Sequence, residues 1–456
     1  MADSYPTQPL RGFSRTQGAH ACRVLRIERF SEIASIVARA RDSGQALSLR
    51  GCGLSYGDSS FHRHALVLDL SRLNRFHEID RATGRVRIEP GVNFRDLFQV
   101  MGPHGWGPGV TPGLSDVTVG GALAFDVHGK NHRRAGGFSR SVRSFDLRTA
   151  DGERVSITRE TEPELFTATV GGAGLTGVIE RMELQLYPLT SARVKVHSEA
   201  VVGVDSAIKA LEARAEMNSV VYWGDLLNAR RSGRTLGVVL ATEPDSNAPA
   251  FNPEEWAAPV KRPPLHLIAP AYNSLSMRLF NKLFGWRATH GGESKSVGER
   301  TSRFPWDGMA TWNRLYGAPG FFEYQFVVPA STAVGIVSEV ADRTIKSDAD
   351  CYLFAMKLMS EGEGLLSYGL RDGVSILMDF PATRQAASLL ASFDAIIASA
   401  GGRIHLAKDS RMTAAAASAI YSDALDSFRG TLARIDPANM FTNAMADRLA
   451  LRDEST

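Results

Sequence analysis

Residues 118–132, TVGGALAFDVHGKNH, bring glycines, a short apolar run and titratable side chains together in one segment. Gly120 and Gly121 have no Cβ atom, so their backbone amides can approach a phosphate or a ring edge closely. The polar groups that follow are His128, Lys130, Asn131 and His132. This combination favours a cofactor site, whereas the alternative is a glycine-rich turn followed by a polar surface run.

Two other glycine-rich loops have a similar character. Residues 50–58, RGCGLSYGD, follow a predicted strand over residues 46–49, which is the usual arrangement for holding a pyrophosphate on backbone amides. Residues 171–177, GGAGLTG, precede a predicted strand that ends at Tyr187. Each loop alone is equally typical of a plain turn, but the three together indicate one large ligand.

The composition narrows the class of protein. The 456 residues are enough for two domains with separate cores, and the 52 basic and 49 acidic side chains give no reason to expect nucleic acid as a partner. Cys22, Cys52 and Cys351 are too few and too scattered for a disulfide framework, and none has the spacing of a metal site. We therefore expect a reducing compartment and no metal.

Apolar periodicity predicts an α+β fold of short alternating elements. The predicted helices cover residues 33–44, 94–101, 206–217, 332–345 and 384–400, with a long one from residue 413. The predicted strands cover residues 66–70, 86–88, 178–186, 238–241, 324–328 and 375–378. Ser31 and Gly44 are the expected start and stop signals of the first helix, and Asp151-Gly152 is the expected turn of a hairpin.

Three segments lie outside this alternation. Residues 244–270 are rich in proline and are expected to wrap the surface or to form a lid. Residues 291–303, GGESKSVGERTSR, are polar and are expected to be mobile. Residues 403–411, RIHLAKDSR, are expected to form a strand followed by a turn.

The order of the loops resembles the vanillyl-alcohol-oxidase, or PCMH, type of FAD-binding domain and, within that superfamily, the oxidases of polyprenyl-phosphoryl ribose. The blocks HGKNH and AKDSR carry this resemblance more specifically than the glycine loops do. The segments that match are residues 53–58, 118–121, 126–132, 174–177, 312–317, 324–326 and 407–411. The resemblance implies an FAD-binding domain over residues 1–190, an α+β substrate domain with an antiparallel sheet over residues 191–402, and a C-terminal segment, residues 403–456, that returns to the first domain.

The resemblance also implies which residues contact FAD. They are Arg50, Gly51, Cys52, Gly53, Leu54, Ser55, Tyr56, Gly57, Asp58, Gly113, Thr118, Val119, Gly120, Gly121, Phe125, Asp126, Val127, His128, Ile179 and His405. A purely structural histidine is the alternative for His128, and His405 is expected to contact FAD through its backbone. Some related oxidases bind flavin covalently through a histidine at the position of Leu54. Leucine has no nucleophilic nitrogen, so we expect non-covalent FAD.

The implied reaction is oxidation of the 2'-hydroxyl of a polyprenyl-phosphoryl-β-D-ribose to a ketone, the first half of an epimerisation to the arabinose lipid used in cell-envelope arabinan synthesis. Such an oxidation needs a hydride acceptor and a base for the hydroxyl proton. The candidates for proton transfer or positioning are Lys408, Tyr56 and Lys130. Their structural alternatives are a salt bridge for Lys408, loop packing for Tyr56 and a surface position for Lys130.

Five other residues match the substrate pocket of the family: Trp223, Tyr316, Gln325, Lys357 and Asp379. Core packing is the alternative for Trp223 and Tyr316, whereas Gln325 and Lys357 are costly to bury without a role. A cysteine of the mycobacterial pattern is replaced here by Leu377. Thiol-directed inactivators of the family are therefore expected to fail, and the shape of the pocket is expected to differ.

The expected partners are a polyprenyl-phosphoryl sugar and a separate NAD(P)H-dependent short-chain reductase that completes the epimerisation. No signal peptide and no membrane-spanning run is recognisable, so the expected location is cytoplasmic or peripheral to the inner membrane. Two alternatives remain at this stage. One is a soluble sugar or aldonolactone oxidase that uses oxygen, and the other is a flavin-binding scaffold without turnover.

Overall fold

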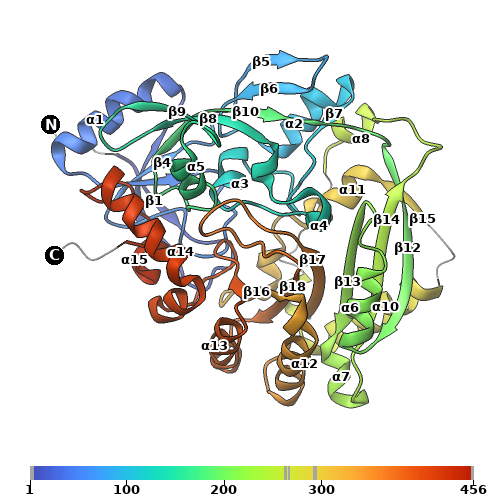
Figure 1. The fold of residues 1–456 in the computed structure, drawn as a ribbon. Coiled ribbons are helices and arrows are strands. Elements are labelled where there is room, and N and C mark those ends of the chain that lie inside the picture. The colour runs from blue at the N-terminus through green and yellow to red at the C-terminus, as the bar shows by residue number, and fades with distance from the viewer. Residues whose placement is uncertain (1–4, 261–263, 265–267, 291–294, 453–456) are drawn as a thin grey trace.

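The strands of this computed structural model form four sheets, and the description covers residues 5–260, 264, 268–290 and 295–452. Two of the sheets belong to the N-terminal part of the chain (Figure 1). One has the order β1-β2-β4-β3, with β4 parallel to both β2 and β3. The other is antiparallel with the order β5-β6-β10-β8-β9. The strands are β1 (Thr7–Leu10), β2 (His20–Arg26), β3 (Leu47–Arg50), β4 (Leu66–Asp69), β5 (Phe76–Asp80), β6 (Arg85–Ile88), β8 (Val142–Arg148), β9 (Arg154–Thr158) and β10 (Val178–Gln185).

A large antiparallel sheet of eight strands follows in the chain, with the order β15-β12-β14-β13-β17-β18-β16-β19. A two-stranded pairing of β7 (Trp106–Gly107) with β11 (Tyr187–Pro188) precedes it. The eight strands are β12 (Arg193–Val202), β13 (Ser219–Asp225), β14 (Leu236–Pro244), β15 (Lys295–Gly298), β16 (Phe321–Pro329), β17 (Leu353–Met359), β18 (Gly373–Pro381) and β19 (Arg403–Ile404). The α+β class and the antiparallel sheet predicted from the sequence are confirmed.

Three helices, α6, α12 and α13, pack on one face of the large sheet, and their apolar side chains form its core. Tyr324, Phe326 and Val328 alternate onto this face from β16. The opposite face therefore presents the intervening positions, among them Gln325. The α-helices of the described residues are α1 (Ile33–Ser43), α2 (Phe94–Met101), α3 (Val119–Ala124), α4 (His132–Ala135), α5 (Pro163–Thr169), α6 (Val204–Glu212), α7 (Leu226–Ser232), α8 (Pro253–Ala257), α10 (Ser274–His290), α11 (Glu299–Arg303), α12 (Ala330–Lys346), α13 (Arg384–Ser399), α14 (Ala414–Ile435) and α15 (Ala444–Leu449).

Most of the predicted helices and strands are present, but the start of α1 and the end of α6 differ from the prediction. Gly44 ends α1 in the left-handed conformation, as predicted, but Ser31 does not cap this helix because a short 3-10 turn over Phe30–Glu32 leads into it. Helix α6 stops at Glu212 instead of residue 217. The amides of Arg214, Ala215 and Met217 bond to carbonyls three residues back, so the chain turns there instead of continuing the helix.

The structure bears on the expectations for residues 291–303 and for the proline-rich residues 244–270. Residues 291–294 lie outside the described part of the chain, but Lys295–Gly298 pair with β12 and Glu299–Arg303 form α11, so the expected mobility is wrong for residues 295–303. Of the proline-rich segment, residues 261–263 and 265–267 are likewise outside the description. Its Trp256 is buried and stacks on Phe98 of α2 at 4.1 Å between ring centroids. This part of the segment therefore wraps α2.

The segment between α14 and α15 returns to the N-terminal sheet, where Phe441 pairs with Leu47 of β3, and Figure 1 shows the two helices in red. The Leu47 amide donates to the Met440 carbonyl, and the Thr442 amide donates to the Leu47 carbonyl, at 2.7 and 2.8 Å. This return supports the division that we propose, with residues 1–190, 191–402 and 403–456 as three parts.

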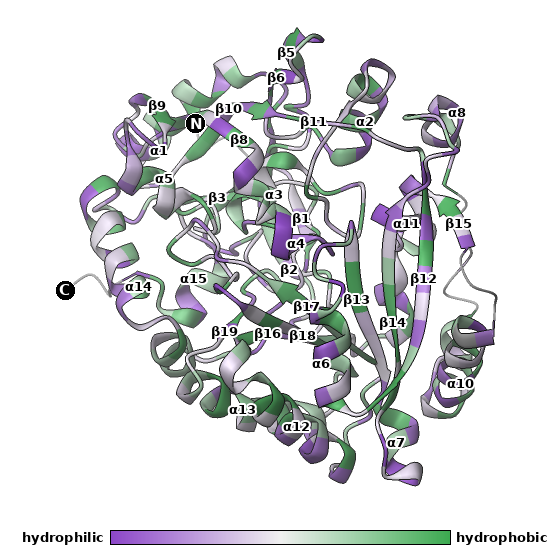
Figure 2. Ribbon diagram, turned by 45° about the vertical axis from the view of Figure 1, so that its right-hand side comes forward, coloured by the Kyte–Doolittle hydropathy of each residue, from purple (hydrophilic) through white to green (hydrophobic). Residues whose placement is uncertain are grey.

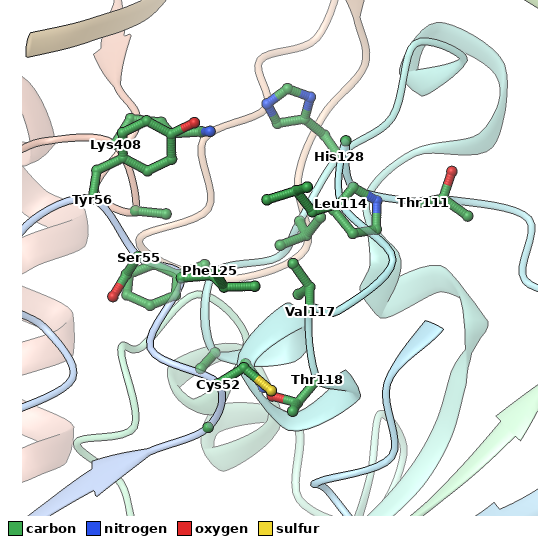
Figure 3. Close-up of a pocket in the computed structure, with 18 of the residues that line it drawn as sticks. Cys52, Ser55, Tyr56, Thr111, Leu114, Val117, Thr118, Phe125, His128 and Lys408 are labelled. Carbon is green, nitrogen blue, oxygen red and sulfur yellow. The ribbon is translucent and has the colours of Figure 1, made fainter. Parts of the chain in front are cut away.

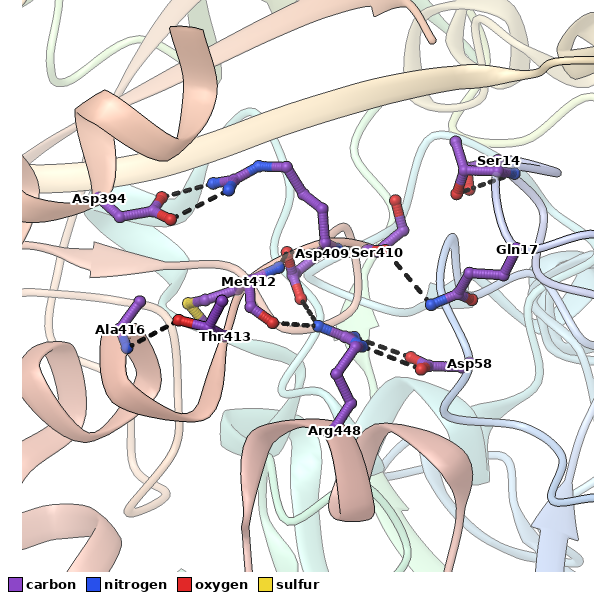
Figure 4. A network of polar contacts seen from close by, with 12 residues as sticks. Ser14, Gln17, Asp58, Asp394, Asp409, Ser410, Met412, Thr413, Ala416 and Arg448 are labelled. Carbon is purple, nitrogen blue, oxygen red and sulfur yellow. Dashed lines mark hydrogen bonds and ion pairs between the residues drawn. The ribbon is translucent and has the colours of Figure 1, made fainter. Parts of the chain in front are cut away.

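An arginine of α15 joins the first glycine loop to the C-terminal segment. Arg448 donates two hydrogen bonds to the carboxylate of Asp58 at 2.8 and 2.9 Å and one to Asp409 at 2.7 Å (Figure 4). A further bond reaches the Met412 carbonyl at 2.8 Å. Both carboxylates are more than nine-tenths buried, so the loss of the guanidinium would leave two buried negative charges without their partner.

We expect Arg448→Met to destabilise the protein by about 3 kcal/mol, because breaking a buried ion pair by removing one partner is costly. The matched control is Arg371→Met, whose ion pair with Glu361 is exposed and is worth at most about 1 kcal/mol. Differential scanning calorimetry of both variants checks this. Equal shifts of the unfolding temperature in the two variants would contradict it.

Candidate active site

One cavity collects residues from all three glycine loops, from the large sheet and from the C-terminal segment. In Figure 3, Cys52 lies beside Thr118 in one part of the cavity, and the side chains of Tyr56 and Lys408 lie together in another. Of the predicted site residues, those that line the cavity are Arg50, Gly51, Cys52, Gly53, Leu54, Ser55, Tyr56, Gly113, Thr118, Gly120, Gly121, Phe125, Val127, His128, Lys130, Ile179, Gln325, Lys357, His405 and Lys408.

The first glycine loop packs so closely against its neighbours that its glycine positions leave no room for a side chain. A Cβ atom on Gly51 would collide with the Thr118 hydroxyl, and Gly53 has a φ of 65°. A Cβ atom on Gly57 would collide with the Asp409 carbonyl, and the Tyr56 amide donates to the Ala407 carbonyl at 2.8 Å. The loop therefore joins the helix that begins after Thr118 to the segment that carries Lys408.

Gly120, the first glycine after Thr118, contacts Pro90 through its backbone and does not offer its amide to a ligand. Thr118 caps the short helix α3, and Gly120 lies in its first turn. The Gly120 amide donates to the Pro90 carbonyl at 2.9 Å, and a Cβ atom there would lie 2.7 Å from the Pro90 Cβ. The expectation that this amide is free for a phosphate is therefore wrong, because Gly120 allows close packing on Pro90.

Four residues expected to contact FAD do not line the cavity. Gly57 packs on Asp409, and Asp58 binds Arg448. Val119 is buried in the core of the first domain. Asp126 accepts hydrogen bonds from the Ser139 amide and the Ser367 hydroxyl, so its carboxylate fixes two loops behind the cavity. These four residues lie behind the cavity and hold the residues that line it in place.

Lys408 lies between an aromatic ring and a carboxylate. Its Nζ atom is 3.7 Å from the centroid of the Tyr56 ring and 2.9 Å from Oε1 of Glu323. Burial, together with the negative charges of Glu323 and Asp379, raises the pKa of Tyr56 well above its ordinary value. The phenol is therefore protonated and can donate a hydrogen bond, while its face stabilises the ammonium.

Two carboxyl groups stand side by side behind Lys408. Glu323 of β16 and Asp379 of β18 are directly opposite each other in the antiparallel register, and both are nearly fully buried. Burial and the charge of Glu323 raise the pKa of Asp379 well above its ordinary value, and Lys408 acts in the opposite direction. Asp379 consequently holds a proton next to Glu323 and Lys408. Asp379, expected on the pocket wall, acts from behind it.

His128 and Gln325 form a polar contact at the cavity wall. The Gln325 amide nitrogen lies 3.0 Å from Nε2 of His128, so Nε2 accepts and the proton of the ring resides on Nδ1. Burial and the positive charge of Lys357 hold the pKa of His128 well below its ordinary value, so the ring is neutral. Within the described part of the chain, His128 Nδ1 and Gln325 Oε1 have no hydrogen-bond partner.

Two lysines add positive charge to the same cavity. Lys130 donates to the Ser302 carbonyl at 2.8 Å, and burial lowers its pKa to about 8. Burial and the charge of Lys408 lower the pKa of Lys357 to about 7, against the attraction of Glu323. An anionic group bound between them would restore both charges. The alternative of a surface lysine does not apply to Lys130, which is half-buried and lines the cavity.

The remaining predicted residues lie in different surroundings. Trp223 packs on Phe284 of α10 at 4.6 Å between centroids, and Tyr316 stacks on Phe321 at 4.7 Å. Neither lines the cavity, so both occupy the packing role that the sequence left open. The His405 amide donates to the Gln325 carbonyl at 2.9 Å, and its ring stacks on Tyr368.

Sequence reasoning missed three residues of the site. Glu323 stands two positions before Gln325 on one strand, so the period of two could have placed both on the cavity face. Trp312 lies inside a matched segment and lines the cavity. Arg448 gave no local signal, since Asp58 is 390 residues away in the chain and Asp409 is 39 residues away. Leu377, which replaces the cysteine of the family, also lines the cavity.

The residues fit a non-covalently bound FAD. The unpaired donor on His128 and the unpaired acceptor on Gln325 complement the alternating acceptors and donors at the edge of a flavin ring. Leu54 lines the cavity and offers no nitrogen for a covalent bond. The loops around Gly51 and Gly53 leave the main chain accessible on the cavity side.

Comparisons with known proteins agree with this geometry. A model of the FAD binding domain family matches residues 23–158, and one of D-arabinono-1,4-lactone oxidase matches residues 374–449. The chain is 32% identical over 459 residues to decaprenylphosphoryl-beta-D-ribose oxidase of Mycolicibacterium smegmatis, with 98% of each chain covered. It is 32% identical over 382 residues to an uncharacterized protein of Streptomyces coelicolor, with 79% of this chain and 100% of the other covered. Mouse (Mus musculus) L-gulonolactone oxidase is 24% identical over 216 residues, which cover 46% of this chain and 49% of the other.

The fold and the cavity thus define an FAD-dependent oxidoreductase with a PCMH-type FAD-binding domain and an appended antiparallel sheet. Among such enzymes, the full-length similarity is decisive because it includes the substrate domain as well as the cofactor domain. The chain belongs to the family of decaprenylphosphoryl-beta-D-ribose oxidase.

Proposed function

We propose that the protein oxidises the 2'-hydroxyl of a polyprenyl-phosphoryl-β-D-ribose to the 2'-ketone. The observation that carries this proposal is the placement of Lys408, Glu323 and the two further lysines in the FAD cavity of a chain similar over its whole length to a decaprenylphosphoryl ribose oxidase. The lysines Lys130 and Lys357 supply positive charge for a phosphodiester. Lys408 and Glu323 supply a route for a proton.

An FAD bound in this cavity would supply the acceptor for the hydride of the 2' carbon of the sugar. Lys408 removes the proton of the 2'-hydroxyl. Its ammonium group donates a hydrogen bond to the hydroxyl oxygen, passes one proton to Glu323, 2.9 Å away, and takes the hydroxyl proton in its place. Tyr56 keeps the ammonium in place through its ring face, and Asp379, by holding a proton of its own, limits the repulsion on the charged Glu323.

A soluble sugar or aldonolactone oxidase is the second candidate, and the match of residues 374–449 to a lactone oxidase model is the observation in its favour. The similarity to L-gulonolactone oxidase spans less than half of this chain, so it has less support than the first candidate. In that case a free aldonolactone would reduce the flavin, and the lipid would have no effect.

The product of the proposed reaction is a ketone, so a second enzyme must deliver a hydride to its other face. We propose a separate NAD(P)H-dependent short-chain reductase for this step, which completes the epimerisation to the arabinose lipid of the cell envelope.

We also propose that the FAD-dependent protein itself works at the surface of the membrane, because its substrate carries a long prenyl chain. Within the described residues, no helix has the length and apolar character needed to cross a bilayer.

Anaerobic mixing of the FAD-loaded protein with farnesyl-phosphoryl ribose tests the proposed function. We expect the flavin absorbance to bleach, and Lys408→Met to slow bleaching by a factor of about 100 or more while the protein retains FAD, since proton transfer by a positioned side chain contributes that much. Acid precipitation should leave the flavin in the supernatant. Bleaching by an aldonolactone and not by the sugar lipid would favour the second candidate.

The affinity for the phosphodiester should depend on pH. The pKa values of Lys357, about 7, and Lys130, about 8, lie below that of an ordinary lysine, so both positive charges are present at pH 6 and are lost by pH 9. We expect the affinity for methyl farnesyl phosphate, whose single charge does not titrate in this range, to fall by roughly tenfold or more over that interval. Titration by intrinsic fluorescence measures it.

The control for this titration is Lys357→Met, which should bind more weakly at pH 6 and lose the part of the pH dependence that is centred near pH 7. An affinity that stays constant between pH 6 and pH 9 would show that neither lysine faces the phosphate.

A further inference from the structure

Helix α10 (Ser274–His290) exposes an unusual amount of apolar surface. The described residues include eleven exposed large hydrophobic side chains, and five of them belong to this helix. They are Leu275, Leu279, Phe280, Leu283 and Trp286, with exposed fractions from 54% to 76%. A contiguous group of this kind marks a contact surface, whereas scattered single residues would not.

The exposed residues form a stripe on the side of the helix that faces away from the protein. Leu275, Leu279, Leu283 and Trp286 follow one another at intervals of four, four and three residues, which places them on one face. The opposite face is anchored by Asn281, which is buried and donates to Asp225 at 3.1 Å. Figure 2 shows α10 at the outer edge of the molecule beside β12.

The charges on α10 are all of one sign. The helix contains Arg278, Lys282 and Arg287 and no aspartate or glutamate. At 100° per residue, the exposed Lys282 falls on one side of the apolar stripe and the exposed Arg287 on the other, whereas Arg278 is half-buried and donates to the Leu227 carbonyl at 2.9 Å. Basic side chains that flank an exposed apolar face, with a tryptophan at its end, are typical of helices that lie in the interface of an anionic bilayer.

The helix and the cavity share one face of the large sheet. Ser219 and Trp223 point to the same side of β13, since they are four residues apart in a strand. Ser219 lines the cavity, and Trp223 packs on Phe284 of α10. Just before α10, the Tyr272 hydroxyl donates to Tyr316 at 3.3 Å, in an aromatic cluster that includes the cavity residue Trp312.

We propose that the outer face of α10 docks on an anionic phospholipid membrane, with its apolar stripe in the acyl boundary and its basic residues at the phosphates. This inference rests on the proposed function, because a lipid-linked sugar embedded in a bilayer must reach the cavity. Docking through α10 places the cavity face of the sheet next to the membrane that holds the substrate.

Vesicle flotation of the FAD-loaded protein tests this docking. We expect the protein to float with vesicles of phosphatidylcholine and phosphatidylglycerol and to bind pure phosphatidylcholine vesicles more weakly. Leu279→Glu/Leu283→Glu should abolish flotation, and Lys282→Gln/Arg287→Gln should weaken it by about fivefold for each charge removed. The matched control is Ile79→Glu/Val334→Glu, which changes two exposed apolar residues on other elements and should float like the parent protein.

Activity separates this inference from the proposed function. The α10 variants should reduce flavin normally with farnesyl-phosphoryl ribose in detergent and slowly with a long-chain substrate in vesicles. Flotation of the parent protein without any flavin reduction would refute the function and leave the docking intact. The docking is overturned if the Leu279→Glu/Leu283→Glu variant floats like the parent, or if the parent fails to float and α10 instead holds two copies together in size-exclusion chromatography.

Discussion

Arg448 binds two carboxylates that the chain brings from far apart, Asp58 of the first glycine loop and Asp409 of the C-terminal segment. The rest of the site depends on this interaction, because Asp409 directly follows Lys408 in the chain. The close approach of Gly57 to the Asp409 carbonyl and the hydrogen bond from the Tyr56 amide to Ala407 reinforce it. The segment that contacts the first glycine loop therefore also fixes the position of the Lys408 amine in the cavity.

Desolvation sets the chemistry of the cavity. Burial and the charge of Glu323 raise the pKa of Asp379 well above its ordinary value, so Asp379 retains its proton beside Glu323. The same burial lowers the pKa of Lys357 and keeps His128 neutral. We propose that Glu323 accepts a proton at one end of the cavity. A bound anion would restore the full positive charge of Lys130 and Lys357. Both functions follow from removing water around a few side chains on the three adjacent strands β17, β18 and β16 and on the loop that carries His128.

Local patterns predicted the elements well, since α2 and the strands that flank the glycine loops follow apolar periodicity that needs no distant partner. Partners distant in sequence escaped prediction. Glu323 looks like an exposed carboxylate until β16 is known to lie inside a sheet, and Gly120 looks like a phosphate contact until Pro90 is placed against it. Helix α10 was not predicted because five of its large apolar residues face outward and the polar Asn281 faces the protein, which is the reverse of the pattern expected for a surface helix.

The central claim is that Lys408 and Glu323 act as one unit that receives the hydroxyl proton. A double-mutant cycle with Lys408→Met and Glu323→Gln, measured as the rate constant of anaerobic flavin reduction by farnesyl-phosphoryl ribose, tests it directly. The account predicts that each single variant is much slower than the parent and that the double variant is about as slow as Lys408→Met alone. Effects that multiply, as for two independent residues, would contradict it.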